Sequence, residues 1–246
     1  MKRFQNKVAL VTGAGSGIGL ATARRISAEG GTVVAGILDQ SQRAVVKDFD
    51  AVVLDVRSEQ AWESAMNHVV GHHGGLDVLV NSAGISPTGT AEETSWELWD
   101  DVMAINLKGT FIGCKKAIPL MRNRGGGAIV NLASINGIRG NTRLVAYAAT
   151  KGGVVAMTMS LALDHVGENI RVNCVCPASI DTPMIREMIA EAADQAAVER
   201  ALIAKHPIGR MAQPEEVAAA IAFLASPDAS FMTGLAIPVD GGRSIR

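Results

Sequence analysis

The sequence predicts one α/β domain: a Rossmann-type, doubly wound parallel sheet of about seven strands with helices on both faces. Three observations predict it. Short runs rich in valine and isoleucine alternate with helical stretches, which is the order of a parallel sheet covered by helices. A glycine-rich turn follows the first run. The 246 residues and 48% apolar content suit one core, since chains divide into domains mainly beyond about 250–300 residues.

Each strand and helix is expected from its local pattern. Strands are short β-branched runs bounded by Gly, Asp or Asn, expected at Val8–Thr12, Thr32–Ile37, Ala51–Val56, Leu76–Asn81, Ala128–Leu132, Arg171–Val175 and Leu235–Val239. Helices are expected between them, at Ile18–Ala28, Glu59–His72, Trp96–Met121, Tyr147–Val166 and Glu215–Leu224. Pro214 followed by two glutamates is typical of a helix start, because proline and acids suit the first turn. Residues 1–246 are therefore expected to form a single domain.

The segment 180–207 is the one ambiguous region. It is helix-prone, yet it lies between Pro183 and Pro207. A segment of this kind after a late strand predicts an integral substrate-binding segment that acts as a lid. A plain pair of surface helices is the alternative.

Composition and charge exclude several classes of protein. The 23 basic and 24 acidic residues give a net charge of −1, so nothing favours nucleic acid or an anionic membrane as a partner. The longest apolar run, Val217–Ala225, is too short to cross a bilayer, and the first residues lack the apolar core of a signal peptide. We therefore expect a soluble, cytoplasmic protein with no membrane partner.

The cysteines predict neither a disulfide framework nor a metal site. Cys114, Cys174 and Cys176 are an odd number without metal-ligand spacing. Free cysteine is among the most buried residue types, so we expect small core residues and no bound metal.

A glycine-rich turn between the first strand and the first helix predicts a phosphate-binding site. Thr12–Gly19 reads TGAGSGIG, with Gly13, Gly17 and Gly19 in the pattern TGxxxGxG. Glycine allows backbone conformations barred to other residues and lets a pyrophosphate approach closely. The following helix offers unpaired N–H groups and the positive end of its dipole. The turn therefore predicts a dinucleotide ligand, and a turn that binds nothing is the alternative.

Four side chains form the candidate catalytic group. Tyr147, the only tyrosine, and Lys151 lie four residues apart on an expected helix, so they share one face. A cation held nearby would lower the pKa of the phenol toward neutral pH. Ser134 follows the strand Ala128–Leu132, at the edge where functional residues of parallel sheets gather. Asn106 lies mid-helix, a poor place for an amide without a partner, which indicates a specific contact.

These motifs, in this order, resemble the short-chain dehydrogenase/reductase family over nearly the whole chain. Thr12–Gly19 is similar to its cofactor loop, and Tyr147–Lys151 matches its YxxxK motif. Ser134 precedes Tyr147 by thirteen residues, as the family's serine usually does. Three further segments resemble family motifs: Asn81-Ser82-Ala83-Gly84 (NNAG, with serine for the second Asn), Val102–Leu107 (the catalytic-Asn helix) and Pro177-Ala178 with Ile180 and Thr182 (the nicotinamide-amide segment).

The resemblance implies an NAD(P)-dependent oxidoreductase that moves a hydride between nicotinamide and a carbonyl or secondary alcohol. Tyr147 would exchange the proton with the substrate oxygen, and Lys151 would lower the tyrosine pKa and bind the nicotinamide ribose. Ser134 would orient the carbonyl, and Asn106 would position a water that links Lys151 to solvent. Together with Asp39, the implied cofactor contacts are Gly13, Ser16, Gly17, Ile18, Gly19, Asp55, Val56, Asn81, Ala83, Gly84, Tyr147, Lys151, Pro177, Ile180 and Thr182.

We expect NAD rather than NADP as the cofactor. A carboxylate at the end of the second strand binds the ribose hydroxyls of NAD and repels the 2′-phosphate of NADP. Asp39 lies twenty residues after Gly19, which fits the general spacing. The family's acid usually falls two residues earlier, where this chain has Ile37, so a turn after Ile37 must bring Asp39 back. Ser16 is neutral where NADP-dependent members often carry a basic residue.

The substrate and the class of protein have alternatives. Within the same chemistry, the substrate is a 3-oxoacyl thioester, a sugar or polyol, or a small alcohol. The substrate pocket is expected to be lined by residues after Ser134 and by the stretch Met184–Met188. The residues after Ser134 are Ile135, Asn136, Ile138 and Arg139. Arg139 and Arg186 in these segments are either anion anchors or solvated surface residues. A non-enzymatic nucleotide-sensing protein on the same fold is the different-class alternative, against which the intact catalytic set argues.

The two long helices predict an oligomer. They carry apolar residues on more than one side, and a helix that is apolar all round is buried. Another subunit would cover the free face, and closed symmetric assemblies are the usual result. The family resemblance implies a homotetramer. The apolar residues concerned are Ala117, Ile118, Met121, Val154, Met157, Leu161 and Leu163.

Overall fold

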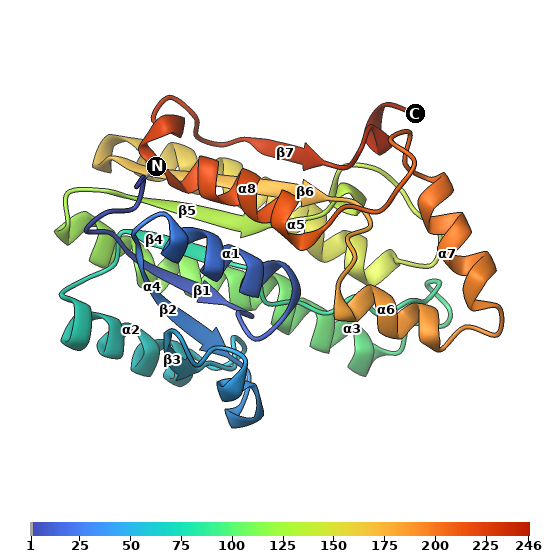
Figure 1. Ribbon diagram of the computed structural model, residues 1–246, viewed down its shortest axis with the longest axis horizontal. Helices are drawn as coiled ribbons and strands as arrows, with labels where there is room; N and C mark the ends of the chain where they lie inside the picture. The colour runs from blue at the N-terminus through green and yellow to red at the C-terminus, as the bar shows by residue number, and fades with distance from the viewer. Residues whose placement is uncertain (1) are drawn as a thin grey trace.

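Seven parallel strands form one sheet at the centre of the fold, in a computed structural model that describes residues 2–246. Their order is β3-β2-β1-β4-β5-β6-β7, so chain order reverses between β1 and β4 (Figure 1). The carboxyl ends of all the strands meet at one edge, because every pair is parallel. This confirms the predicted doubly wound sheet. The strands are β1 Val8–Thr12, β2 Thr32–Ile37, β3 Asp50–Val53, β4 Val78–Asn81, β5 Gly127–Leu132, β6 Ile170–Pro177 and β7 Ala236–Val239.

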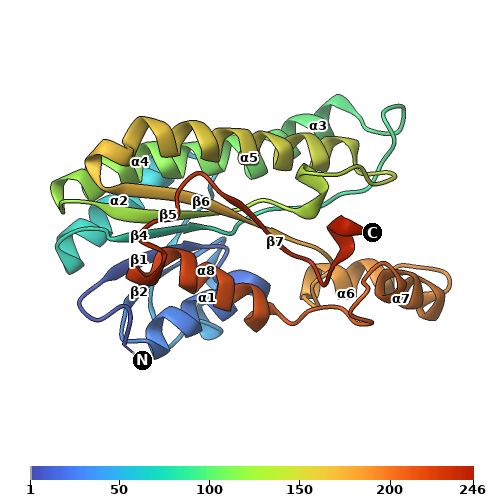
Figure 2. The same ribbon diagram turned by 90° about the horizontal axis from the view of Figure 1, so that it is seen from above.

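Helices cover both faces of the sheet. They are α1 Gly17–Ala28, α2 Glu59–His73, α3 Trp96–Val102, α4 Gly109–Asn123, α5 Val145–His165, α6 Pro183–Ala190, α7 Gln195–Ala204 and α8 Pro214–Ala225. Figure 2 shows α1 and α8 on one face and α2, α4 and α5 on the other. The helices α6 and α7 lie beyond the carboxyl ends of the strands (Figure 1).

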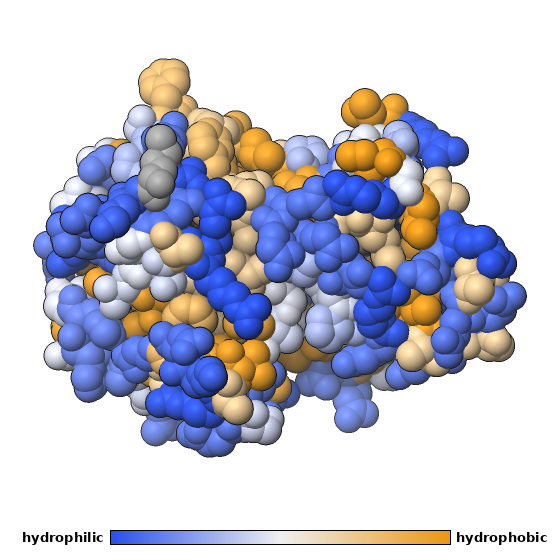
Figure 3. Space-filling view, viewed as in Figure 1, coloured by the Kyte–Doolittle hydropathy of each residue, from blue (hydrophilic) through white to orange (hydrophobic). Residues whose placement is uncertain are grey.

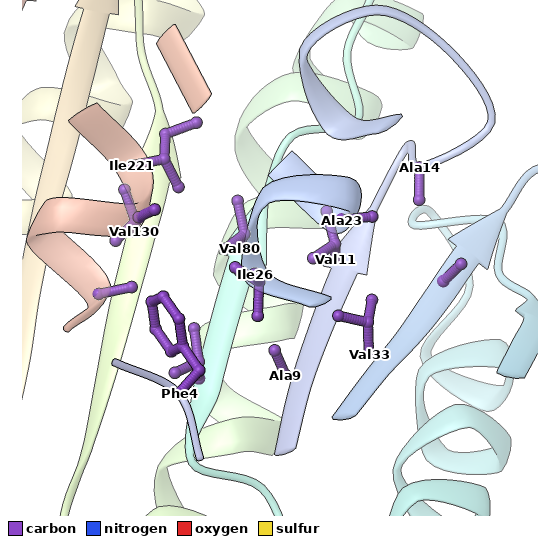
Figure 4. Close-up of a cluster of buried hydrophobic side chains, with 14 of the residues drawn as sticks. Phe4, Ala9, Val11, Ala14, Ala23, Ile26, Val33, Val80, Val130 and Ile221 are labelled. Atoms are coloured by element: carbon purple, nitrogen blue, oxygen red, sulfur yellow. The ribbon is translucent and has the colours of Figure 1, made fainter. Parts of the chain in front are cut away.

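An apolar core lies between the sheet and the pair α1 and α8. Figure 4 shows Ile26 of α1 beside Val80 and Ile221 of α8 beside Val130, with Phe4 in the same cluster. All five side chains are buried. Every residue of β1 is buried as well, as expected for a strand covered on both faces.

The surface seen from the side of α1 and α8 is mostly hydrophilic, with apolar side chains in separate groups (Figure 3). Across residues 2–246, no helix combines the length and the apolar character needed to cross a membrane.

The second core, under α2 and α4, is organised around Trp62. This side chain is fully buried, and its indole Nε1 donates to the carbonyl of Val56 at 3.1 Å. Gly113 of α4 makes the contact possible, because a Cβ there would lie 2.6 Å from the Trp62 ring. Trp62 therefore holds the chain just after β3 in place.

Several elements differ from their predicted limits by one or two residues, and one strand differs by more. The strand expected over Ala51–Val56 ends at Val53, because the chain turns there and the carboxylate of Asp55 accepts the N–H of Arg57 at 3.0 Å. The ambiguous segment 180–207 forms α6 and α7.

The helix expected over Trp96–Met121 is present as one continuous helical segment, but it is not regular throughout. The structure has α3, then a π-helical segment at Met103–Lys108, then α4. Asn106 lies in the widened turn, and its amide bonds to backbone outside the helix. This outside contact accompanies the departure from regular α-helix, as is common where a side chain serves a functional site.

Trp62→Ala should lower the free energy of unfolding by about 3–5 kcal/mol, the usual cost of truncating a buried aromatic side chain. Urea denaturation measures it. Trp96→Ala is the matched control, because Trp96 is 83% exposed; it should change stability by no more than about 0.5 kcal/mol. Equal losses in the two variants would contradict the central role of Trp62.

Candidate active site

A cleft of about 380 Å³ opens at the carboxyl ends of the strands. Open α/β sheets bind ligands at this edge, near the point where strand order reverses. Most of the predicted site residues line it: Gly13, Ser16, Gly17, Ile18, Gly19, Asp55, Val56, Ala83, Gly84, Ser134, Tyr147, Lys151, Pro177, Ile180 and Thr182.

The glycine turn after β1 packs directly against the loop after β4. The Thr12 hydroxyl oxygen accepts the N–H groups of Ser82 and Ala83, at 3.0 and 3.1 Å. Gly13 has a φ of +62°, and a Cβ there would lie 2.9 Å from the Cα of Ala83. Glycine is required at this position for both reasons.

The first turn of α1 suits an anion. Ser16 precedes the helix, and within the described chain its side chain makes no capping hydrogen bond. The first turn also lacks an acidic residue, so its N–H groups and the positive dipole end remain available. Gly17 (φ +51°) faces the methyl group of Thr182, where α6 begins. These features fit the pyrophosphate of a dinucleotide.

Tyr147 and Ser134 come together from different elements. Ser134 is buried after β5, and its Oγ accepts the N–H of Asn136 at 3.1 Å and donates to the carbonyl of Pro177 at 3.5 Å. It also lies near enough to Tyr147 to lower the pKa of the phenol. Gly137 allows this segment to approach α5, because a Cβ there would lie 2.6 Å from the Lys151 carbonyl group. A hydroxyl and a phenol are thereby presented together to the cleft.

The ammonium group of Lys151 lies close to the Tyr147 ring. Its Nζ donates to the carbonyl of Leu132 at 2.6 Å and lies 5.6 Å from the centre of the Tyr147 ring. Burial lowers the pKa of Lys151 to about 8. Burial also raises the pKa of Tyr147, and the nearby hydroxyl of Ser134 opposes this only in part. The lowered tyrosine pKa that the resemblance implied is therefore not found in this structure, where desolvation outweighs the other effects on the phenol.

Asn106 connects the loop after β4 to helix α5, which carries Tyr147 and Lys151. Its side chain is fully buried and does not line the cleft described here for residues 2–246. Its Oδ1 accepts the N–H of Ile85 and its Nδ2 donates to the carbonyl of the same residue, both at 2.9 Å. The amide also donates to Thr150 Oγ1 on α5, at 3.3 Å. The specific contact expected for Asn106 is confirmed.

Within residues 2–246, two of the residues predicted to contact the cofactor do not line the cleft. Asn81 is buried behind the cleft wall, because its amide donates to Asn131 on the neighbouring strand at 2.9 Å. Asp39 is exposed and accepts the N–H of Ser41 at 2.8 Å. Its neighbour Leu38 does line the cleft.

Known proteins resemble this chain over almost its full length. Residues 13–244 match the family model described as enoyl-(acyl carrier protein) reductase. A meso-2,3-butanediol dehydrogenase of Serratia marcescens is 43% identical over 98% of this chain and 95% of its own length. A 3-oxoacyl-(acyl-carrier-protein) reductase of Thermotoga maritima is 42% identical over 98% of both chains. The ligand-free aldohexose dehydrogenase of Thermoplasma acidophilum superposes with a TM-score of 0.92 at 37% identity, over 98% of this chain and 95% of that chain.

The chain belongs to the short-chain dehydrogenase/reductase family. It is therefore an oxidoreductase that acts on carbonyl or alcohol groups with a nicotinamide dinucleotide.

Several cleft residues of this dehydrogenase/reductase were not predicted. Five of them directly follow a strand, and taking the first residue after every strand would have found them: Leu38, Leu54, Ser82, Ala133 and Ala178. No such local signal marks the others, which reach the cleft through packing: Gln42, Arg57, Ile85, Ile105 and Leu132. Pro183 and Met184, which also line the cleft, belong to the segment 180–207 that was predicted to bind the substrate.

The depressed pKa of Lys151 predicts a pH dependence of stability. Between a folded-state pKa of about 8 and the ordinary value of 10.5, the unfolded chain binds more protons than the folded chain. Stability contributed by this group therefore rises with pH across that window. Lys151→Met should remove the rise while abolishing activity.

Urea denaturation of both proteins at about pH 7.5 and about pH 9.5 measures the difference. The stability of wild type relative to Lys151→Met should increase at the higher pH. A constant difference would show that the lysine is not destabilised by burial.

Proposed function

We propose that this enzyme interconverts a small, uncharged secondary alcohol and its ketone, with NAD as the redox partner and Tyr147 as the proton carrier. The observation that carries the proposal is the Tyr147–Ser134 pair above a buried Lys151, in the cleft that the glycine turn also lines. A phenol and a hydroxyl that line the same part of the cleft can both reach one substrate oxygen.

The cleft favours an uncharged substrate. The loop after β4 and the start of α6 contribute apolar lining, with Ile85, Pro183 and Met184. Arg139 and Arg186, the two residues considered as anchors for an anionic substrate, both bind other groups of the protein. Arg186 pairs with Asp181 and Glu199 at 2.5 and 2.6 Å, and Arg139 donates to the backbone carbonyl of Arg243.

The proposed chemistry follows from the protonation state of the tyrosine. When bound, the nicotinamide supplies or accepts the hydride. The raised pKa of Tyr147 keeps the phenol protonated at neutral pH, ready to donate its proton to a ketone oxygen. In the oxidative direction Tyr147 must first lose that proton, so alcohol oxidation is favoured at higher pH. Ser134 Oγ holds the substrate oxygen near the phenol.

A second candidate is reduction of a 3-oxoacyl thioester. The relative from Thermotoga maritima carries that activity in its name, and the matching family model is described as an acyl carrier protein reductase. The chemistry at the tyrosine would be the same. The distinction lies in the substrate, because a thioester carried by a protein needs a long open channel, whereas a small alcohol does not.

The proposal of NAD rests on charge at the end of β2. Asp39 is a carboxylate at neutral pH, since hydrogen bonds from Ser41 lower its pKa. Leu38 and Gln42, on either side of it in sequence, line the cleft. The nearest cations are held in place: Arg57 pairs with Asp55 at 2.8 Å, and Arg43 donates to a backbone carbonyl. The 2′-phosphate of NADP would thus be repelled by the charge of Asp39, and neither Arg57 nor Arg43 would be free to bind it.

The proposed homotetramer rests on exposed apolar side chains. Of the residues that predicted it, Ala117, Ile118, Met121 and Val154 pack inside this chain. Leu163, also among those residues, is 78% exposed, and Phe111 of α4 and Met159 of α5 add exposed apolar surface. Phe231, before β7, is fully exposed as well. Exposed apolar side chains of this kind suit burial against other subunits in a symmetric assembly.

A cytoplasmic location and a lid complete the proposal. All three cysteines are free thiols, which suits a reducing compartment. The segment 180–207 begins at cleft residues Ile180 and Thr182 and continues into α6 and α7. We place the substrate under this segment, which closes over the bound dinucleotide.

Wild-type protein should transfer hydride to NAD with small secondary alcohols, and Tyr147→Phe should reduce kcat at least about 10²-fold, the lower range for a positioned acid–base group. The panel contains butanediols, cyclohexanol, aldohexoses and a 3-oxoacyl thioester, followed by absorbance of reduced nicotinamide. Dinucleotide binding by the variant, measured by calorimetry, is the control. Turnover of the thioester alone would favour the second candidate, and near-normal turnover by Tyr147→Phe would exclude the tyrosine.

Asp39→Ala should shift the cofactor preference toward NADP severalfold or more, because the variant removes the charge facing a 2′-phosphate. The measurement is kcat/KM for both cofactors in both proteins. Asp48→Asn removes a nearby exposed charge and should leave the ratio unchanged. If wild type prefers NADP, or if the Asp39 variant keeps the wild-type ratio of kcat/KM for the two cofactors, Asp39 does not determine the choice between NAD and NADP.

Leu163→Glu should split the tetramer into dimers, because it places a charge in the proposed α4–α5 interface. Light scattering coupled to size-exclusion chromatography measures the mass at micromolar concentration. Glu187→Gln, on α6, is a control that should stay tetrameric. A wild-type monomer would contradict the assembly.

A further inference from the structure

Two histidines and one aspartate converge at the amino edge of the sheet. The Nε2 atoms of His68 and His73 lie 2.7 and 2.8 Å from the same oxygen, Oδ2 of Asp50. One ligand-type atom from each of the three residues lies within 4.8 Å of the other two. All three side chains are partly exposed, between 19 and 30%. The cluster is thus compact and open to solvent.

This cluster lies at the opposite edge of the sheet from the active site. Asp50 is the first residue of β3, whereas the cleft is formed where the strands end. His73 is the last residue of α2, and His68 lies five residues before it. The proposed redox chemistry therefore makes no use of these side chains.

Their chemistry is that of a transition-metal site. Imidazole nitrogen and carboxylate oxygen are the common ligands of Zn²⁺, at about 2.0–2.2 Å from the ion. In a tetrahedral site such ligand atoms lie about 3.3–3.6 Å from each other. Opening the two His–Asp contacts by less than about 1 Å would therefore admit an ion. Solvent exposure leaves room for water in the fourth position.

The surrounding charges also favour a cation. The three residues lie where α2 ends, at the negative end of the helix dipole. Within residues 2–246, neither arginine nor lysine pairs with Asp50, so only the two imidazoles compete for its carboxylate.

We propose that Asp50, His68 and His73 bind one divalent transition-metal ion, Zn²⁺ or a chemically similar ion, which ties the edge strand β3 to the last turn of α2. This reverses the expectation, drawn from the cysteines, that the chain holds no metal. The role is structural, and it is independent of the proposed substrate and cofactor. The competing explanation is a metal-free hydrogen-bonded triad.

The first test uses the full chain without a histidine tag, stripped with a chelator and titrated with zinc chloride. Calorimetry should give one ion per chain. At a free Zn²⁺ concentration about 100 times the Kd, Tm should rise by about 5–10 °C. Ni²⁺ and Co²⁺ should bind at the same site, Co²⁺ with new visible absorption bands, and Mg²⁺ should not bind, because it prefers all-oxygen ligands.

The second test removes single ligands conservatively. Asp50→Asn and His73→Gln should each weaken Zn²⁺ binding by more than about 10-fold, since changing even a residue behind a ligand costs about 10–100-fold. His72→Gln is the matched control. Its ring stacks on His68 at 4.0 Å, and its Nδ1 contacts a backbone carbonyl of its own helix, so the variant should bind Zn²⁺ like wild type.

The outcomes separate the two explanations. Retained binding in both ligand variants, or loss only in His72→Gln, overturns the assigned ligands. If Zn²⁺ does not raise the Tm of wild type, the metal proposal is wrong and the cluster is a metal-free hydrogen-bonded triad. If one ligand variant does not fold, the other decides, and dehydrogenase activity of the stripped protein is recorded separately.

Discussion

The buried ammonium of Lys151 is the constraint on which the arrangement of the active site depends. A cation removed from water needs a polar partner, and the carbonyl of Leu132 at the end of β5 provides one at 2.6 Å. That bond holds α5 against the end of the strand, so that Tyr147, one turn earlier, lies beside Ser134. The same burial depresses the lysine pKa to about 8. The fold thus holds this buried cation in a form that is unfavourable for stability, as functional sites often do.

A local distortion of the helix connects this group to the rest of the cleft. The π-helical turn at Met103–Lys108 carries Asn106, whose amide bonds both backbone groups of Ile85 and also reaches Thr150. The loop after β4, the π-turn and α5 are therefore one hydrogen-bonded unit. Because the amide is fully buried, breaking any of these bonds would leave polar groups without partners. This accounts for the tolerance of an irregular turn inside a long helical segment.

The two edges of the sheet serve different purposes in this enzyme. The carboxyl edge holds the redox site, and the amino edge holds the cluster of Asp50, His68 and His73 proposed to bind a metal. The strand β3 connects them, because Asp50 begins it and the cleft residues Leu54 and Asp55 follow its end. β3 is also an edge strand with a neighbour on one side only. An ion that ties its start to α2 would limit the freedom of this edge strand.

The sequence by itself determined the alternating elements, the glycine turn and the spacing of Tyr147 and Lys151, since each depends on contacts within a few residues. Only the tertiary structure decided which side chains face the cleft. Asn81 turns away because its amide is taken by Asn131, fifty residues further along the chain, on the neighbouring strand. The pKa of Lys151 likewise depends on how completely α5 is covered. His68 and His73 meet Asp50 only because α2 packs beside the start of β3, and no short-range pattern records such packing.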